Sequence, residues 1–179
     1  MSIFRFIKNS LGNVEKGQSE TQTEATDQII KALQRFDANN ARYLAGFAYI
    51  LARVAHADLH ISTKESLEME RIVTQQGKLP EEQAKIVVSM VKTQNIMFGG
   101  TESFLVTREF SGLASVEQKK SLLHCLFAVS SSDDTIDTVE DNEIRKISKE
   151  IGLKHTDFIS ARSAFRQHLS VLQQSSEHT

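Results

Sequence analysis

Apolar residues recur at intervals of three and four along most of this 179-residue chain, the spacing that gathers them on one face of an α-helix. The run over residues 43–55 predicts a core-facing helix that ends near Ala57. Pro80 and the two glutamates after it predict the start of another helix, because proline suits the first turn and acids suit the positive end of the helix dipole. Further stripes predict a shorter helix over 104–113 and longer ones at about 115–131 and 154–174. Several helices with short connections predict an all-α bundle.

The first 26 residues are expected to lie outside this bundle. Residues 1–11 combine apolar and basic side chains as a short amphipathic helix does, and residues 12–26 are polar and aperiodic, as a linker is. We therefore expect a segment and linker over 1–26 and one helical domain over 27–179. The segment is expected to dock on its own domain or on a protein partner. A membrane surface is the alternative, disfavoured because Arg5 and Lys8 alone attract a bilayer only weakly. The apolar residues of the segment are Ile3, Phe4, Phe6, Ile7 and Leu11.

Composition agrees with a helical domain and excludes several classes of protein. One proline and eight glycines leave few turns for a β-sandwich or barrel. The net charge of −2 lacks the basic excess of a nucleic-acid binder, so no nucleic-acid partner is expected. No apolar stretch approaches the roughly 20 residues that span a membrane. The single Cys125 lies in an apolar run and is expected to be a buried, reduced thiol of a cytoplasmic protein.

An internal repeat is the most informative feature of the chain. Residues 51–72 align without a gap on residues 126–147, and a glycine follows each copy, at Gly77 and Gly152. The shared pattern is an apolar helix, then Asp-x-x-Ile-[Ser/Asp]-Thr-x-Glu-x-x-Glu, then a second helix. Two copies are too few for a solenoid. They predict a pseudo-symmetric pair of helix-turn-helix hairpins in one core.

Part of the repeat has a structural explanation. Ser62 with Glu65, and Asp137 with Glu140, have the spacing of capping boxes, in which each side chain accepts a hydrogen bond from the other residue's backbone amide. Ile61 and Ile136 stand just before these caps, the position of a hydrophobic staple.

Asp58 and Asp133 are harder to explain, because each follows a long apolar helix whose negative end disfavours a carboxylate. One interpretation is an Asx-turn, in which the side chain accepts hydrogen bonds from loop amides. The other is a divalent cation shared with Glu65 or Glu140 and with loop carbonyls. The residues alone leave both interpretations open.

At these residues the chain resembles the TerB-like family, which comprises the tellurite resistance protein TerB and its relatives, among them the N-terminal domain of membrane-anchored J-domain co-chaperones. The family pattern is an Ala-rich helix that runs into an Ala-Asp-Gly-x-[Ile/Val]-x-x-x-Glu turn, present twice. Residues 57–65 and 132–140 match it, and the likeness extends over roughly residues 41–172. The glycine after the aspartate is replaced by Leu59 and Asp134, so a left-handed turn there is expected to be less favourable. No J-domain is present in this chain, so the co-chaperone role does not transfer.

This resemblance implies an all-α domain of about seven helices and a metal-associated or stress-response role in bacteria. The turn acids are the candidate ligands of a divalent metal ion whose identity is unknown. Carried over position by position they are Asp58, Glu65, Asp133 and Glu140, and Asp137 joins them in the second turn.

Other metal and catalytic motifs have less support. The second turn fails as an EF-hand, because Thr138 replaces the glycine at the sixth loop position and Ile144 replaces the glutamate at the twelfth. His56 and His60 have a spacing that binds zinc on a helix, but exposed histidines at a helix end are the favoured interpretation. A metal-dependent hydrolase lacks a paired base, a nucleophile and a phosphate-binding loop.

The sequence thus favours a non-enzymatic TerB-like protein of tellurite resistance or stress response that binds a divalent cation at two acidic turns. The alternative is a module for protein interaction or membrane-surface docking, whose acidic turns are purely helix caps. The expected location is cytoplasmic, with residues 1–11 as the contact to a protein partner or to the inner membrane surface.

Overall fold

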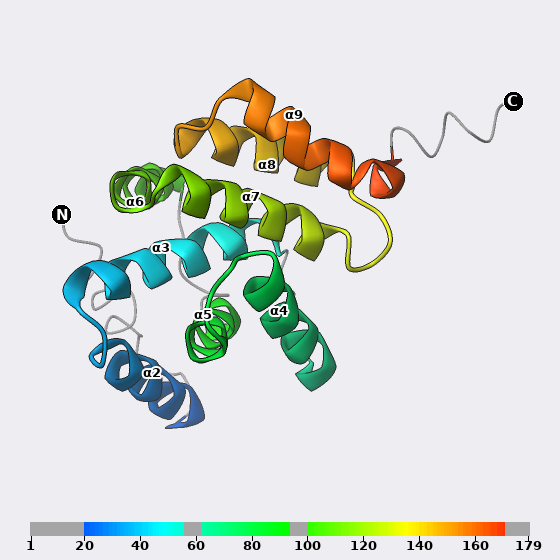
Figure 1. The fold of residues 1–179 in the computed structure, drawn as a ribbon. Coiled ribbons are helices and arrows are strands. Elements are labelled where there is room, and N and C mark those ends of the chain that lie inside the picture. The colour runs from blue at the N-terminus through cyan, green and yellow to red at the C-terminus, as the bar shows by residue number, and fades with distance from the viewer. Residues whose placement is uncertain (1–19, 56–61, 94–99, 171–179) are drawn as a thin grey trace, which may run out of the picture.

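The computed structural model describes residues 20–55, 62–93 and 100–170, with side chains from 27 and 105 onward in the first and last ranges. Eight α-helices and one short 3-10 helix make up these residues, joined by short connections, and no strand occurs among them (Figure 1). The predicted all-α bundle is therefore confirmed. The helices are α2 (Glu20–Leu33), α3 (Ala38–Val54), α4 (Thr63–Gln75), α5 (Glu81–Thr93), α6 (Gly100–Leu113), α7 (Val116–Ser130), α8 (Thr138–Glu150) and α9 (His155–Ala164), and the 3-10 helix is η1 (Arg166–His168).

Helix α3 is the centre of the bundle. Most of its residues are buried, and it packs against α5, α6, α7 and α8. Figure 1 shows it between α7 and α6 on one side and α5 on the other. A helix that is apolar on nearly all sides is stable in water only when other helices surround it. Gly46 allows a close contact between α3 and α6, because a Cβ there would lie 3.0 Å from atoms of the Phe110 side chain.

The internal repeat folds into the two predicted hairpins, α3–α4 and α7–α8. They pack crosswise, since α3 contacts α8 while α4 contacts α7, and α3 and α7 contact each other. Equivalent positions are buried in both copies, because each hairpin contributes the same face to one shared core. These pairs are Leu51 and Leu126, Val54 and Val129, Met69 and Ile144, and Ile72 and Ile147.

Helix boundaries differ from the predictions in the N-terminal part of the chain. Residues 12–26 are predicted to be a linker, whereas α2 already begins at Glu20. Glutamate, glutamine and alanine have high helix propensity, so a polar sequence continues the helix that Ile29 and Leu33 anchor in the core. Helix α6 has 14 residues, close to the 13 of α5 and the 15 of α7, so it is not the shorter helix predicted over 104–113. The predicted amphipathic helix over 1–11 lies outside the described residues.

The last helix is also shorter than predicted. A helix to about Gln174 is expected from the apolar stripe, but α9 ends at Ala164 and η1 follows. Leu169 has extended backbone angles and forms an isolated parallel β-bridge with Ile136. Leu169 still belongs to the apolar stripe, since its side chain is buried at 2% exposure, although its backbone is no longer helical.

No helix in the described ranges has the length and apolar character needed to cross a membrane.

We expect Gly77→Ala to destabilise the fold by about 1–3 kcal/mol, because overpacking a close contact forces the backbone or core to shift. A Cβ at Gly77 would lie 2.5 Å from the carbonyl oxygen of Val73 and 2.9 Å from Cζ of Phe47. Gly112→Ala is the matched control, since no atom lies within 4 Å of its Cβ position in α6. That control is expected to stabilise by about 0.5–1 kcal/mol through helix propensity. Urea unfolding of both variants measures the difference, and equal midpoints would contradict the packing argument.

Candidate functional site

The second inter-helix turn connects α7 to α8, and two of its carboxylates serve as caps of α8. Asp137 is the N-cap of α8, and its Oδ1 accepts a hydrogen bond from the Glu140 backbone amide at 2.7 Å. Oε2 of Glu140 accepts one from the Asp137 amide at 2.9 Å. The predicted capping box is confirmed, and it satisfies two amides that the first helical turn would otherwise leave without partners.

The first turn ends in the same arrangement. Ser62 is the N-cap of α4, its Oγ accepts from the Glu65 amide at 3.2 Å, and Oε2 of Glu65 accepts from the Ser62 amide at 2.7 Å. Hydrogen bonding to the Ser62 side chain, and secondly to its backbone amide, favours the charged form and lowers the pKa of the Glu65 carboxyl. Asp58 and the two histidines of the zinc interpretation, at positions 56 and 60, lie outside the described residues.

Asp133 and Asp134 are both exposed at the tip of the second turn. Asp134 has φ 71°, so it adopts the left-handed conformation that is common for the glycine of the family pattern. Asp134 thus adopts the left-handed conformation although it replaces the glycine of the pattern. Aspartate is one of the few residues besides glycine that enter this region routinely. The Asp134 amide donates to the carbonyl oxygen of Ser131 at 3.1 Å, which closes the turn.

A segment from the C-terminal part of the chain covers this turn. The Ile136 amide donates to the His168 carbonyl oxygen at 2.6 Å, and the Ser170 amide donates to the Ile136 carbonyl oxygen at 3.1 Å. Nδ1 of His168 lies 3.2 Å from the carbonyl oxygen of Asp134. Ile136 is 1% exposed, but the predicted hydrophobic staple lacks its usual partner, because Asp141 occupies the position four residues after the cap. The backbone bridge takes the place of that staple.

An ion-pair cluster joins the first hairpin to the second. Nη1 of Arg53, near the end of α3, donates to Oε2 of Glu150 at 2.6 Å, and its Nε donates to Oε1 of Glu143 at 2.9 Å. The Arg53 side chain is only 11% exposed. Burial would lower the pKa of Arg53, but the hydrogen bonds to Glu150 and Glu143 raise it above its usual value. The sequence analysis did not identify this cluster, and its one signal is that Arg53 ends the uncharged apolar stretch over residues 43–52.

The described residues do not gather a metal-binding cluster. No group of three or more His, Cys, Asp or Glu side chains in them is placed to hold one ion. One oxygen of Asp137 and one of Glu140 already accept hydrogen bonds from the cap amides. The described part of the second turn therefore does not fit a resident metal in its present arrangement. The assignment of Asp58, Glu65, Asp133, Asp137 and Glu140 as ligands stays a prediction.

The thiol and imidazole on α7 are not arranged for catalysis either. Cys125 is fully buried, and burial raises the pKa of its thiol to about 12. A thiol of that pKa carries almost no thiolate at neutral pH, and the thiolate is the nucleophile. His124 is at the edge of the core, as predicted, with its ring 6.3 Å from that of Phe165. Desolvation is the larger cause of the lowered pKa of His124, and the charge of Lys78 adds to it.

Comparison with known proteins adds one finding. The family model described as tellurite resistance protein TerB matches residues 44–163, which is two thirds of the chain. The match begins within α3 and ends within α9, so it includes both inter-helix turns, the second hairpin and most of the first. Neither the curated proteins nor the solved structures include one that matches the chain.

We expect Arg53→Met to destabilise the fold by about 2 kcal/mol, because it leaves two partly buried carboxylates without their partner while keeping most of the apolar stem. Arg71→Met on α4 is the matched control, since the Arg71 pair with Glu68 is exposed and such pairs contribute at most about 0.5 kcal/mol. Chemical unfolding at neutral pH and moderate salt compares the two variants. If both lose the same small amount, the cluster does not join the hairpins energetically.

Asp137→Ala is expected to cost about 1 kcal/mol of stability through loss of the α8 cap, whereas Asp137→Asn keeps an accepting oxygen and costs a few tenths. Asp133→Ala is expected to stay within about 0.5 kcal/mol of the unsubstituted chain, because Asp133 is exposed. Thermal unfolding of the three variants gives the order of their stabilities. An Asp133→Ala loss larger than that of Asp137→Ala would show that the turn depends on its tip and not on its cap.

Proposed function

The chain belongs to the TerB family of tellurite resistance proteins, and on that premise we propose that it acts as a non-enzymatic interaction module in a tellurite or related stress response. In this proposal the two acidic turns are helix caps that hold the hairpins in register. A protein partner is bound through the rest of the surface and through residues 1–11. The single observation that carries the proposal is the capping box at each turn, because it gives the family's turn glutamates a structural role.

The non-enzymatic part of this proposal is supported by the chemistry of the described residues. The buried Cys125 thiol has a pKa of about 12, and the neighbouring His124 faces an aromatic ring. Among the ion pairs of the described part, the least exposed arginine, Arg53, is held by two glutamates. A catalytic site needs a reactive group that is both accessible and activated by a neighbour, and these groups lack one or both properties.

Cation binding is the alternative, and one observation favours it. Asp134 keeps the left-handed turn of the family pattern and, together with Asp133, places two exposed carboxylates at its tip. A cation at this turn would share the carboxylates of Asp137 and Glu140 with the N-cap of α8, because one oxygen of each already accepts a cap amide. Calorimetry with calcium, magnesium, zinc and manganese separates the two candidates. Heat that is lost in Asp133→Ala would establish the cation function in place of the structural one.

We expect cells that lack this gene to be more sensitive to tellurite and the full chain to restore their growth. Asp133→Ala should restore growth equally, because the turn tip has no role in the proposed interaction, whereas a chain without residues 1–19 should restore it less. This deletion leaves α2 intact, which begins at Glu20. Growth on a tellurite series measures the effect, and equal thermal unfolding midpoints show that the truncated chain still folds. Failure of Asp133→Ala together with full rescue by the truncated chain would reverse the proposal.

A further inference from the structure

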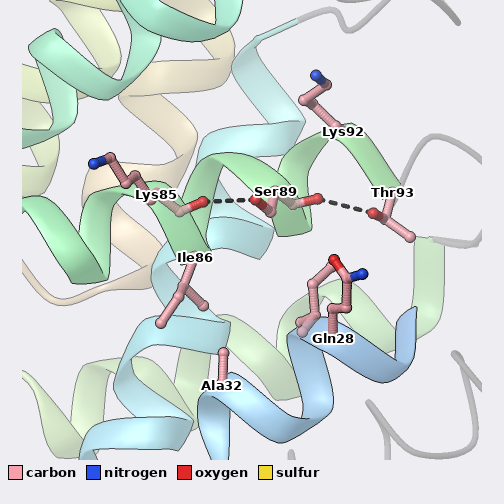
Figure 2. A pocket seen from close by; sticks show the side chains of 8 residues that line it. Gln28, Ala32, Lys85, Ile86, Ser89, Lys92 and Thr93 are labelled. Carbon is pink, nitrogen blue, oxygen red and sulfur yellow. Dashed lines mark hydrogen bonds between the residues drawn. The ribbon is translucent and has the colours of Figure 1, made fainter. Parts of the chain in front are cut away.

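A pocket of about 360 Å³ lies between α2 and α5, and its size is at the lower end of the range of ligand pockets. Three of its side chains are apolar, and Figure 2 shows two of these, Ile86 and Ala32, pointing toward each other. The other five are polar, and each of them can donate hydrogen bonds. The lining residues are Gln28, Ile29 and Ala32 from α2, and Lys85, Ile86, Ser89, Lys92 and Thr93 from α5.

The charge of this lining is opposite in sign to that of the whole chain. The lining holds two lysines and neither aspartate nor glutamate, which gives +2, whereas the chain carries −2. Lys92 forms no ion pair with a described residue, and Nζ of Lys85 lies 2.6 Å from a carboxylate oxygen of Glu81. Because exposed pairs of this kind are weak, an anion in the pocket can draw Lys85 away from Glu81.

The two lysines stand on one face of α5, with Ser89 between them. They are seven residues apart, which is about 10.5 Å at the rise of an α-helix. Both ammonium groups point away from α2 in Figure 2, while the lysine side chains themselves line the pocket. A flexible four-carbon stem lets each ammonium group turn toward the mouth, so the two can converge on one anion above Ser89.

Neutral donors stand beside these cations. Figure 2 shows Gln28 rising from α2 toward Ser89 and Thr93 on α5. Oγ of Ser89 donates to the Lys85 carbonyl oxygen, and Oγ1 of Thr93 donates to the Ser89 carbonyl oxygen, each at 2.8 Å. Carbonyl oxygens inside a helix also accept a backbone amide, so they keep a partner when the hydroxyls turn to a ligand.

We propose that this pocket binds a small phosphate monoester with a short apolar body. Such an ester carries a charge of about −1.5 to −2 at neutral pH and has three strong acceptor oxygens. Two ammonium groups and the donors of Gln28, Ser89 and Thr93 match that charge and those oxygens, and lysine binds phosphate as a point charge. A carboxylate has less charge and a neutral metabolite has none. The apolar body lies between Ile86 and Ala32. This inference goes beyond the proposed function and does not rest on it.

Titration of the isotope-labelled full chain with monobutyl phosphate tests the pocket, and nuclear magnetic resonance measures the shifts of the backbone amides. We expect saturable shifts at Gln28, Lys85 and Ser89, and none at Ile159, which is exposed on α9. Butyl phosphate should bind at least about tenfold more tightly than inorganic phosphate, because burial of two methylene groups is worth about that factor. Shifts that never saturate, or equal affinity for the two probes, would overturn the proposal.

Matched variants place the phosphate at the lysines. Lys85→Gln combined with Lys92→Gln is expected to weaken butyl phosphate binding by at least about tenfold, since it removes both charged donors. Lys146→Gln combined with Lys149→Gln removes the same charge from exposed positions on α8 and is expected to leave the affinity within about twofold. Equal weakening in both double variants would mean general attraction of anions and not a pocket. All four lysines are exposed, so the variants are expected to fold, and thermal unfolding checks this.

A second pair of variants tests the position between the lysines. Ser89→Glu places a carboxylate there and is expected to abolish the saturable shifts. Ser163→Glu is its control, because Ser163 is also exposed on a helix and also donates to the carbonyl oxygen four residues before it. Binding that persists in Ser89→Glu would contradict the assigned position.

Flotation with vesicles distinguishes a soluble ester from phosphatidic acid, a lipid whose headgroup is also a phosphate monoester. The vesicles consist of phosphatidylcholine with or without phosphatidic acid, and we expect the lipid to make no difference. Flotation that requires phosphatidic acid and disappears in the Lys85 and Lys92 double variant would overturn the soluble source. Ligand binding and growth on tellurite are separate measurements, so this inference and the proposed function fail separately.

Discussion

The burial of α3 is the constraint on which the rest of the structure depends. A helix that is apolar on nearly every side must be covered all round, and here four other helices cover it. Two of them, α7 and α8, form the second copy of the hairpin to which α3 itself belongs. The internal repeat therefore has a structural role, because each copy buries part of the apolar surface of the other copy. Neither hairpin would bury its apolar face alone.

This arrangement gives the acidic turns a structural role. A turn that joins two consecutive helices must end one helix and start the next within a few residues, and the first amides of the new helix need acceptors. Ser62 with Glu65 and Asp137 with Glu140 provide them. A short acidic motif that resembles a cation loop is thus also what a helix start requires. The exposed carboxylates at the turn tip are the part of the motif that capping leaves unexplained.

Features set by neighbouring residues could be predicted from the sequence. The start of α5 after Pro80, the helix α7, the capping boxes and the two hairpins follow from residue types and spacing alone, and the structure bears them out. Features set by residues far apart in the chain could not. The partners of Arg53 are about ninety residues away, and the end of α9 depends on the bridge from Leu169 to Ile136. Polar helix ends are a third class of feature. The sequence over residues 20–26 is equally compatible with a linker and with a helix, and it belongs to a helix here because α2 packs against α5.

The bridge between Ile136 and Leu169 has a consequence for how much of the chain counts as one unit. The family match ends at residue 163, before the residues that pair with the second turn. A fragment trimmed to the matched residues would leave both backbone groups of Ile136 without their acceptor and donor and would uncover an isoleucine that is otherwise 1% exposed. The same trimming removes α2 and uncovers Ile86 on α5. Residues that cover the core therefore lie on both sides of the part of the chain that matches the family.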